Sequence, residues 1–208
     1  MKHIKTMGLA VVAALALLAI AGAASASASA VLCSTNTSPC TGTKYGSGTK
    51  LTAQLKSGTH ATLTTSITNV TCTKSSVGGS TNTAEGHGEI SSFAFTGCTA
   101  VSNGSACTVK AVNLNYTATA NPGGGGNGTL TVTPKAGNGN PGATVECPGA
   151  FINCTFTTSS ITLSVTGGNP AIISASNEPL QREGGLCPSE AKWDATYEVT
   201  SPKPLFLV

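Results

Sequence analysis

Residues 108–118 read Thr-Val-Lys-Ala-Val-Asn-Leu-Asn-Tyr-Thr-Ala, and this stretch decides the fold class. Val112, Leu114 and Tyr116 recur at every second position, with polar or small side chains between them. This period is that of a β-strand, in which alternate side chains point to opposite faces of a sheet. We therefore expect these three side chains to face a hydrophobic core.

Shorter alternating segments follow one another at intervals of roughly ten residues along the chain. Clusters of turn-forming residues separate them, at 56–58, 77–79, 102–104 and 166–170. This spacing predicts an all-β fold, an antiparallel β-sandwich of the immunoglobulin-like or jelly-roll-like kind. The expected strands are 50–55, 60–67, 90–95, 108–118, 129–133, 161–165, 171–175 and 192–200, with 202–208 as a closing edge strand.

The last of these strands carries the only tryptophan. Trp193, Ala195, Tyr197 and Val199 share one face by the two-residue period. Such a stripe belongs more often to a core than to a ligand platform, and Phe93 and Phe95 are expected to join it. Asp194 is then an outward residue on the same strand.

The first thirty residues have the pattern of a signal peptide. Lys2, His3 and Lys5 precede an uncharged apolar run over 7–24, and small residues follow at 26–30. This pattern predicts cleavage before Val31, with an uncleaved membrane anchor as the alternative. The expected mature chain, 31–208, is secreted and is extracellular or associated with the cell surface.

The mature chain is expected to be nearly neutral. The full sequence has 11 Lys+Arg and 8 Asp+Glu, and the signal peptide removes two lysines, which leaves 11 − 2 = 9 basic residues against 8 acidic ones. No cluster of Lys or Arg forms a local basic patch, so nucleic acid and a polybasic membrane contact are excluded as partners. We expect no membrane-embedded segment after cleavage.

Eight cysteines in an exported chain predict four disulfides. Local loop closure favours Cys33 with Cys40 and Cys72 with Cys98. For the rest, Cys154 with Cys187 and Cys107 with Cys147 are preferred, and Cys147 with Cys154 is the rival pair. The bridges matter because the core is poor in aromatic residues and rich in alanine, so reduction is expected to be more damaging than any single core truncation.

Two glycine-rich stretches, 121–128 and 137–142, are predicted to be loops. They are either long hairpin loops of one sandwich, or the first is a linker between two halves. A bridge from Cys107 to Cys147 would span both stretches. We therefore expect residues 31–208 to form a single all-β domain.

Residues able to carry catalysis are scarce, because the mature chain has two histidines and one aspartate. Glu85, His87 and Glu89 would project from one face of an extended segment with glycines between them, which suggests a metal cluster. Their spacing of about 6–7 Å on a flat strand is poor for chelation. Glutamate pairs for glycoside hydrolysis cannot be singled out among Glu146, Glu178, Glu183, Glu190 and Glu198. No catalytic, cofactor or metal site is therefore predicted.

Several motifs resemble a group of small secreted actinobacterial proteins of unknown function. The likeness rests on the N-terminal loop 32–40, the segments 45–49 and 95–98, and the tail with Leu-Cys-Pro at 186–188 and Trp-Asp-Ala-Thr-Tyr-Glu-Val-Thr-Ser-Pro at 193–202. The resemblance implies export and disulfide bonding, and it implies no activity.

The expected function is that of a secreted, non-catalytic module with a binding or structural role toward an extracellular protein, polymer or surface component. The first alternative is a secreted hydrolase that uses carboxylates or the Glu85/His87/Glu89 cluster. The second is a secreted protease inhibitor or antimicrobial protein that presents the Cys33–Cys40 loop.

Overall fold

The computed structural model describes residues 30–83, 85–150, 152–184 and 187–208. The signal peptide expected over 1–30 lies outside this part of the chain, except for Ala30. The described residues form antiparallel strands and one short 3₁₀ turn, η1 (Pro148–Ala150). The strands are β1 (Leu32–Cys33), β2 (Lys50–Leu55), β3 (Ala61–Thr65), β4 (Asn69–Thr81), β5 (His87–Ala100), β6 (Ala106–Val112), β7 (Tyr116–Gly124), β8 (Asn127–Thr133), β9 (Gly142–Cys147), β10 (Ile152–Thr157), β11 (Ile161–Thr166), β12 (Ile172–Arg182), β13 (Glu190–Ser201) and β14 (Phe206–Leu207).

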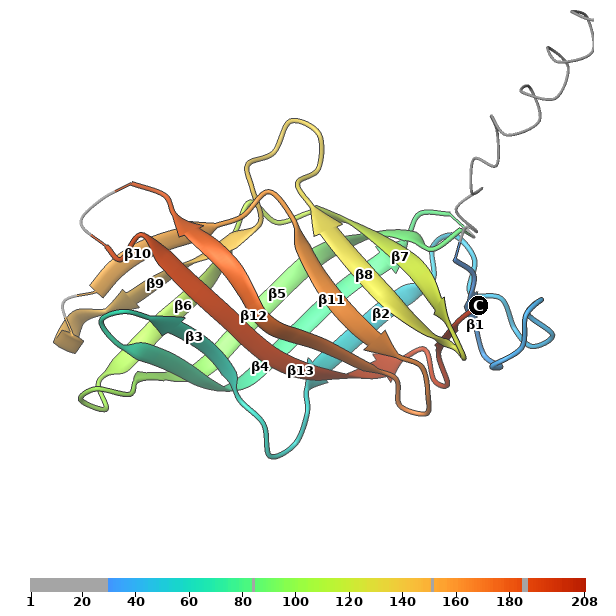
Figure 1. The fold of residues 1–208 in the computed structure, drawn as a ribbon, viewed down its shortest axis with the longest axis horizontal. Coiled ribbons are helices and arrows are strands. Elements are labelled where there is room, and N and C mark those ends of the chain that lie inside the picture. Colours follow the sequence, from blue (N-terminus) through green and yellow to red (C-terminus); the bar gives the residue numbers. More distant parts are fainter. Residues whose placement is uncertain (1–29, 84, 151, 185–186) are drawn as a thin grey trace, which may run out of the picture.

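Four long strands run the length of the molecule, namely β4, β5, β12 and β13 (Figure 1). At each of the other positions in the sheet, two shorter strands that are consecutive in the sequence lie end to end along the long axis. These pairs are β2 with β3, β6 with β7, β8 with β9, and β10 with β11. A short break separates the two members of each pair, and the breaks at 56–60 and 134–141 project from the middle of the molecule (Figure 1).

The strand pairing closes on itself. In the half of the molecule that contains β2, each strand is hydrogen-bonded to the next in the order β5, β7, β8, β11, β12, β13, β2, β4, and β4 pairs with β5 again. In the other half the order is β5, β6, β9, β10, β12, β13, β3, β4. Each half is therefore a closed ring of eight strands around one interior. Rings of this size hold packed side chains or one small ligand.

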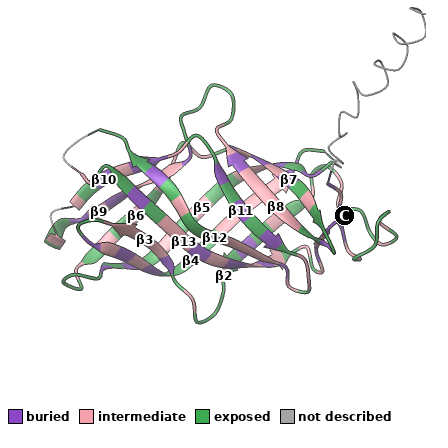
Figure 2. Ribbon diagram, in the orientation of Figure 1, coloured by how far each residue is buried: buried purple, intermediate pink, exposed green. Residues whose placement is uncertain are grey.

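The prediction of an antiparallel, disulfide-stapled and sandwich-like all-β fold is confirmed. Two layers face each other across the interior, and hydrogen-bonded strands join them at both edges (Figure 1). Buried residues alternate with exposed ones along most strands (Figure 2). The chain therefore buries one face of the sheet and exposes the other.

The strand expected over 108–118 is broken in two. Asn113 and Asn115 have φ values of 56° and 72°, and this left-handed conformation ends β6 before β7 begins. The break shifts the alternation by one residue. Val109 packs in the core of β6 and Tyr116 in the core of β7, so the expectation that Val112 shares a face with Tyr116 is wrong.

Two predictions made from glycines are also wrong. Residues 77–79 were expected to turn but lie within β4, where an added Cβ at Gly79 would collide with the Glu89 carbonyl oxygen. Within 121–128, all residues except 125 and 126 belong to β7 and β8. In both places glycine allows two backbones to approach closely within the sheet. The stretch 137–142 is a loop up to Pro141, and Gly142 begins β9.

Four disulfides are present: Cys33–Cys40, Cys72–Cys98, Cys107–Cys147 and Cys154–Cys187. The last three lie at the end of the molecule that carries the turns 66–68 and 101–105, here called the hairpin end. Two of them join neighbouring strands, β4 to β5 and β6 to β9. These disulfides therefore cross-link the strands near one end of the ring, and they do not join the two layers across the interior.

The opposite end, here called the terminal end, is closed by β1 and β14. These strands pair through Leu32 and Leu207, and both side chains are buried. Leu205 and Val199 pack beside them in one cluster. The expected closing strand at 202–208 is thus present as β14. The ring is therefore plugged at the terminal end by the first and last described segments of the chain.

Candidate functional site: a hollow apolar interior

Aromatic side chains from opposite layers meet inside the ring. Phe93 of β5 lies 5.8 Å from Trp193 and 6.1 Å from Tyr197 of β13, measured between ring centroids. β5 and β13 are not hydrogen-bonded neighbours, so these contacts cross the interior. Phe95 stacks on Phe93 at 4.5 Å. The stripe from Trp193 to Val199 therefore faces inward, and Asp194 lies on the other face.

These inward side chains do not fill the interior. Phe93, Phe95, Trp193, Leu130 and Ile173 are only partly buried, although they lie between the two layers. A side chain inside a closed ring can keep accessible surface only where empty space lies beside it. Protein interiors are normally packed as densely as organic crystals, so this space is a distinctive feature of the molecule.

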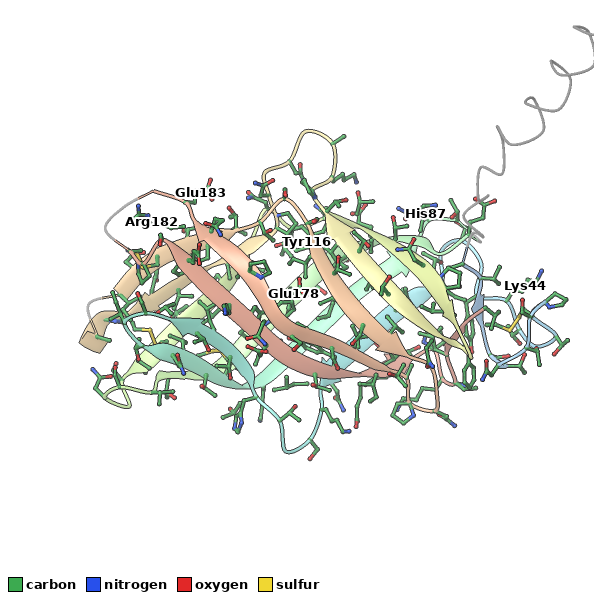
Figure 3. The ribbon with its side chains drawn as sticks, viewed as in Figure 1. Lys44, His87, Tyr116, Glu178, Arg182 and Glu183 are labelled. Atoms are coloured by element: carbon green, nitrogen blue, oxygen red, sulfur yellow. A yellow bond between two sulfur atoms is a disulfide. The ribbon has the colours of Figure 1, made fainter. Side chains whose placement is uncertain are left out.

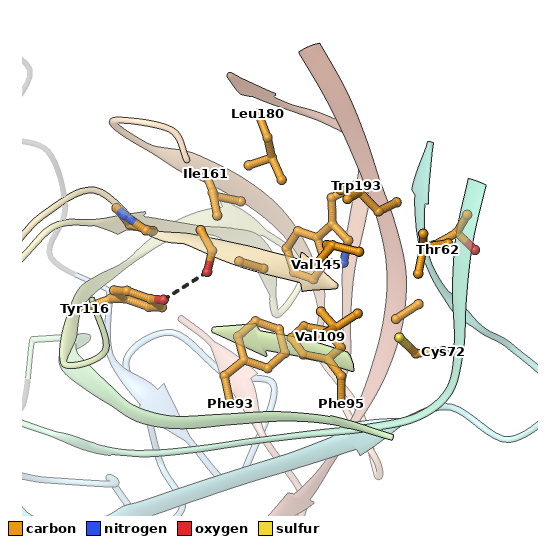
Figure 4. A pocket seen from close by; sticks show the side chains of 16 residues that line it. Thr62, Cys72, Phe93, Phe95, Val109, Tyr116, Val145, Ile161, Leu180 and Trp193 are labelled. Carbon is orange, nitrogen blue, oxygen red and sulfur yellow. Dashed lines mark hydrogen bonds between the residues drawn. The ribbon is translucent and has the colours of Figure 1, made fainter. Parts of the chain in front are cut away.

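Four voids follow one another along the long axis. The rim void, of about 180 Å³, lies at the hairpin end and includes Ile67 and Pro188 in its lining. The aromatic void, of about 60 Å³, lies between Phe95 and Trp193, and Figure 4 shows its lining side chains around an open centre. The middle void has about 60 Å³ and reaches Tyr197. The inner void has about 110 Å³ and ends at the terminal plug.

Neighbouring voids share lining residues, which shows that they are adjacent. The rim and aromatic voids share Leu63, Val70 and Val145. The aromatic and middle voids share Phe93, Tyr116, Ile161 and Trp193. The middle and inner voids share Ala53, Val77, Ile90, Leu130 and Ile173. The four voids therefore follow one another from the hairpin end to the terminal plug, separated by the side chains that they share, and this series of mostly apolar voids is called the track here.

Alanine creates much of this space. Inward positions of the strands hold buried alanines where a larger aliphatic side chain would reach the centre of the ring. Those that line the voids are Ala53, Ala61, Ala118 and Ala120, and Ala175, Ala191 and Ala195 are buried on β12 and β13. This alanine content is the sequence signal that could have indicated a hollow interior, since inward alanines within an eight-stranded ring leave the centre unfilled.

The two inward tyrosines have their hydroxyl groups satisfied. The Tyr197 hydroxyl is 2.9 Å from Ser75 Oγ, which also bonds to the Ala94 carbonyl. The Tyr116 hydroxyl donates to the Val112 carbonyl. Burial raises the pKa of both phenols, because it disfavours the charged phenolate. Both side chains therefore stay neutral and contribute apolar ring surface to the track.

Trp193 differs from the tyrosines, because its indole nitrogen Nε1 is buried without a hydrogen-bond partner. It is the only such buried side-chain polar atom in the described part of the chain. Trp193 lines both the aromatic and the middle void. A buried N–H that makes no hydrogen bond costs about 1–3 kcal/mol. The nitrogen itself has almost no accessible surface, so other parts of the Trp193 side chain line the two voids.

The lining of the track is electrically neutral over most of its length. Among the described residues, no Lys, Arg, His, Asp or Glu lines the rim, aromatic or middle void. His87 and Glu89 border the inner void, but their side chains bond on the outside of the ring, to Thr119 and Lys135. The interior therefore suits an uncharged, apolar occupant.

The residues considered for metal binding do not converge. His87 Nδ1 lies 3.3 Å from Thr119 Oγ1. Glu89 forms a salt bridge with Lys135, in which Nζ and Oε2 are 2.8 Å apart, and Glu85 is exposed. Within the described residues, no group of three His, Cys, Asp or Glu side chains could hold a metal ion. Figure 3 places His87 near the terminal end, on the outside of the strands.

The carboxylates have local roles on the outer surface. Asp194 Oδ1 accepts a 2.9 Å hydrogen bond from the backbone N–H of Asn177, which has a φ of 52° at a bulge in β12. Glu178 accepts a bond of 3.1 Å from the backbone N–H of Thr162. Glu178 and Glu183 lie apart on the outer face in Figure 3. Glu178 and Asp194 therefore satisfy backbone donors of β11 and β12.

The loop closed by Cys33–Cys40 stands out from the terminal end. Residues 36–39 are exposed, and the Thr37 and Thr41 hydroxyls lie 2.7 Å apart at its base. The Asn36 side chain reaches the Gly125 carbonyl at 3.1 Å, which anchors the loop to the β7–β8 turn. This loop is thus both exposed and braced.

Comparison with known proteins found no family model, no curated protein and no solved structure that matches this chain. In addition, no helix in the described part of the chain is long and apolar enough to cross a membrane.

Proposed function

We propose that this protein is a secreted, non-catalytic binding module that holds an apolar small molecule inside its ring of strands. The observation that carries the proposal is the series of adjacent, mostly apolar voids, which extends from the hairpin end to the terminal plug without a charged lining residue before the inner void. Ligand sites in proteins are concave, mostly apolar and largely preformed, and the track has these properties.

Export supports the same function. The signal-peptide pattern, the resemblance to small secreted actinobacterial proteins and the four disulfides agree with an oxidising, extracellular location. A stapled rim keeps the ring closed without filling its centre. Such a scaffold can keep a cavity open at little cost in stability, since three bridges support the hairpin end.

A binding role fits the interior better than the hydrolase alternative. Hydrolysis needs an acid, a base or a metal at the reacting bond. Among the described residues that line the track, the titratable groups are two tyrosines with raised pKa values, and His87 and Glu89, whose side chains bond to Thr119 and Lys135 on the outside of the ring. The side chains of His87, Glu89, Glu178 and Asp194 are instead engaged in hydrogen bonds on the outside of the ring.

The test is the binding of a fluorescent apolar dye, N-phenyl-1-naphthylamine, to the purified mature protein. We expect saturable binding with about one dye per chain. A variant with two inward alanines enlarged, Ala53→Leu with Ala118→Leu, should lose most of the dye binding. The matched control, Ala94→Leu, adds the same side chain on the outer face of β5, where Ala94 is exposed, and should bind as the unmodified protein does. Equal binding by all three proteins would contradict an interior site.

The Cys33–Cys40 loop supports a second candidate function, because it is exposed, cross-linked and hydrogen-bonded at its base. Loops of this kind can act as rigid ligands for a protease or another protein. A panel of serine, cysteine and metalloproteases would test this candidate. Full protease activity in the presence of excess protein would remove it.

A further inference from the structure

Ala30, the first residue that the structure describes, lies inside the terminal plug. Its side chain is only 1% exposed, and it belongs to the same apolar cluster as Leu32, Leu205 and Leu207. The sequence pattern, however, places Ala30 at the end of the signal peptide, directly before the predicted cleavage site. One alanine cannot be both a core residue of the folded chain and the last residue of a discarded leader.

Two small residues pack directly on Ala30. Gly86 precedes β5, and a Cβ built on it would lie 2.9 Å from the Ala30 carbonyl oxygen and 3.1 Å from Ala30 Cβ. The Cβ of Ala120 in β7 is 3.2 Å from the same position, and the Ala120 N–H donates a 2.9 Å hydrogen bond to the Gly86 carbonyl. Gly86 and Ala120 both line the inner void. Ala30 therefore packs behind the wall of that void.

The backbone that follows Ala30 is paired with the last described segment of the chain. The Val31 N–H donates to the Val208 carbonyl at 2.7 Å, and the Val208 N–H donates to the Val31 carbonyl at 3.0 Å. The next residue, Leu32, pairs with Leu207, and Figure 1 shows β1 beside the end marked C. The fold therefore holds residues 30–33 as one segment of the terminal plug.

Two overlapping motifs offer small residues to a signal peptidase, which selects an alanine-x-alanine pattern directly before the cleaved bond. They are Ala-Ser-Ala at 26–28 and Ala-Ser-Ala at 28–30. Cleavage after the second motif removes Ala30 and leaves its contacts with Gly86 and Ala120 unfilled. This cut also falls within the segment that is paired with the last residues of the chain. Cleavage after the first motif keeps the whole plug.

We propose that the signal peptide is cleaved between Ala28 and Ser29, so that the exported chain begins at Ser29 and keeps Ala30 in its core. A signal peptidase hydrolyses this peptide bond, and one water molecule supplies the hydroxyl of the new Ala28 carboxyl group and a proton of the new Ser29 amine. The cleaved bond lies before the segment 30–33, so the enzyme and the terminal plug do not compete for the same residues. The inference rests on the export part of the proposed function and adds the processing site.

The first test is the N-terminus of the exported protein. The full chain, 1–208, is expressed in a bacterial host that secretes it, and the protein in the medium is measured by intact-mass spectrometry and N-terminal sequencing. We expect a single product that begins at Ser29. A product that begins at Val31 would overturn the proposal.

Two variants of the leader sharpen this test. Ala26→Phe places a bulky side chain at the third position before the proposed bond and leaves the motif 28–30 unchanged, so it should lose most of the product that begins at Ser29. The matched control, Ser27→Phe, changes the middle position of the motif, which does not need a small residue, and should be processed as the unmodified chain is. Equal yields of the Ser29 product from both variants would contradict cleavage after the first motif.

A second measurement does not depend on the peptidase. The chains 29–208, 30–208 and 31–208 are released from a fusion partner by a protease that leaves no additional residue, and their thermal unfolding is compared. Loss of one buried methyl group corresponds to a fall in Tm of about 2–4 °C in a domain of this size, so 31–208 should unfold about 2–4 °C below 29–208. The chain 30–208 is the matched control, because it keeps Ala30, and it should unfold with 29–208. Equal Tm values for all three chains would overturn the role of Ala30 in the core.

The outcomes separate this inference from the proposed function. A product that begins at Val31 and still binds the dye would remove the processing site and leave the proposed function standing. A product that begins at Ser29 and binds no dye would support the processing site and contradict the binding role. A product that keeps the entire leader would contradict export and, with it, both proposals.

Discussion

Ala118 of β7 offers a direct test of whether the interior is hollow. Its side chain is 7% exposed and lines the inner void of about 110 Å³. Ala118→Leu adds three carbon atoms to this space. Burial of three carbons stabilises by about 2.4 kcal/mol at about 0.8 kcal/mol each, and the fixed leucine rotamer costs about 0.5–1 kcal/mol. We therefore expect the free energy of unfolding to rise by about 1.5 kcal/mol.

The sign of the change decides the question. In a well-packed core the same enlargement would destabilise by about 1–3 kcal/mol, because neighbouring side chains would be forced from their rotamers. Urea unfolding followed by circular dichroism measures the difference, and a thermal scan should show a rise of roughly 3–6 °C. Ala94→Leu on the exposed face is the matched control and should change stability by less than about 0.5 kcal/mol. A clear loss of stability in Ala118→Leu would refute the hollow interior.

Three further predictions concern the surroundings of the interior. Burial raises the pKa of Tyr197 in the native state, so the native protein keeps a proton that the unfolded chain releases above about pH 10. The free energy of unfolding should therefore be constant below that pH and decline above it. In urea unfolding between pH 8 and 11.5, Tyr197→Phe should make this decline shallower, and an unchanged slope would be inconsistent with this cause. Replacement of Cys107 and Cys147 by alanine opens a loop of 40 residues. By chain entropy, this should lower the free energy of unfolding by about 4 kcal/mol relative to the intact protein under the same conditions. A loss below about 1 kcal/mol would show that the hairpin end does not need the bridge. Asp194→Ala removes the acceptor of the bulge in β12 and should cost about 1 kcal/mol without affecting dye binding, whereas a loss of binding would mean that the bulge shapes the track.

The sequence predicted strands where apolar and polar residues alternate. Residues 50–55 were predicted with the observed bounds of β2. By contrast, β4 was missed, because its inward positions include Ser75, which bonds to Tyr197, and its outward ones are serine, threonine and lysine. A strand with so little apolar contrast gives no period-two signal. The strands β9 and β10 were missed because each is short and its apolar and polar residues alternate only weakly.

The closure of the ring could not be read from local patterns. It depends on the pairing of β5 with β4, β6 and β7 together, and of β13 with β2, β3 and β12. The pairings of β13 with β2 and β3 join strands that lie more than a hundred residues apart in the sequence, and no local pattern specifies them. The continuity of long strands such as β5 was also hidden, because Gly97, with a φ of 62°, interrupts its apolar pattern.

The candidate site was predicted in part. The inward stripe of Trp193, Ala195, Tyr197 and Val199 was predicted from the two-residue period, and it was interpreted as ordinary core. Whether such a stripe meets packed side chains or empty space depends on the residues opposite it, here alanines on several strands. The lack of a partner for Trp193 Nε1 likewise depends on the three-dimensional surroundings of a single atom, which sequence alone does not give.

The central claim is that the ring encloses a preformed apolar space. Xenon occupies apolar cavities in proteins, so a crystal of residues 31–208 pressurised with xenon tests the claim most directly. We expect xenon atoms inside the ring, with one in the inner void beside Ala118, Leu130 and Ile173. An interior filled by its own side chains, with xenon bound only at the outer surface, would contradict the account.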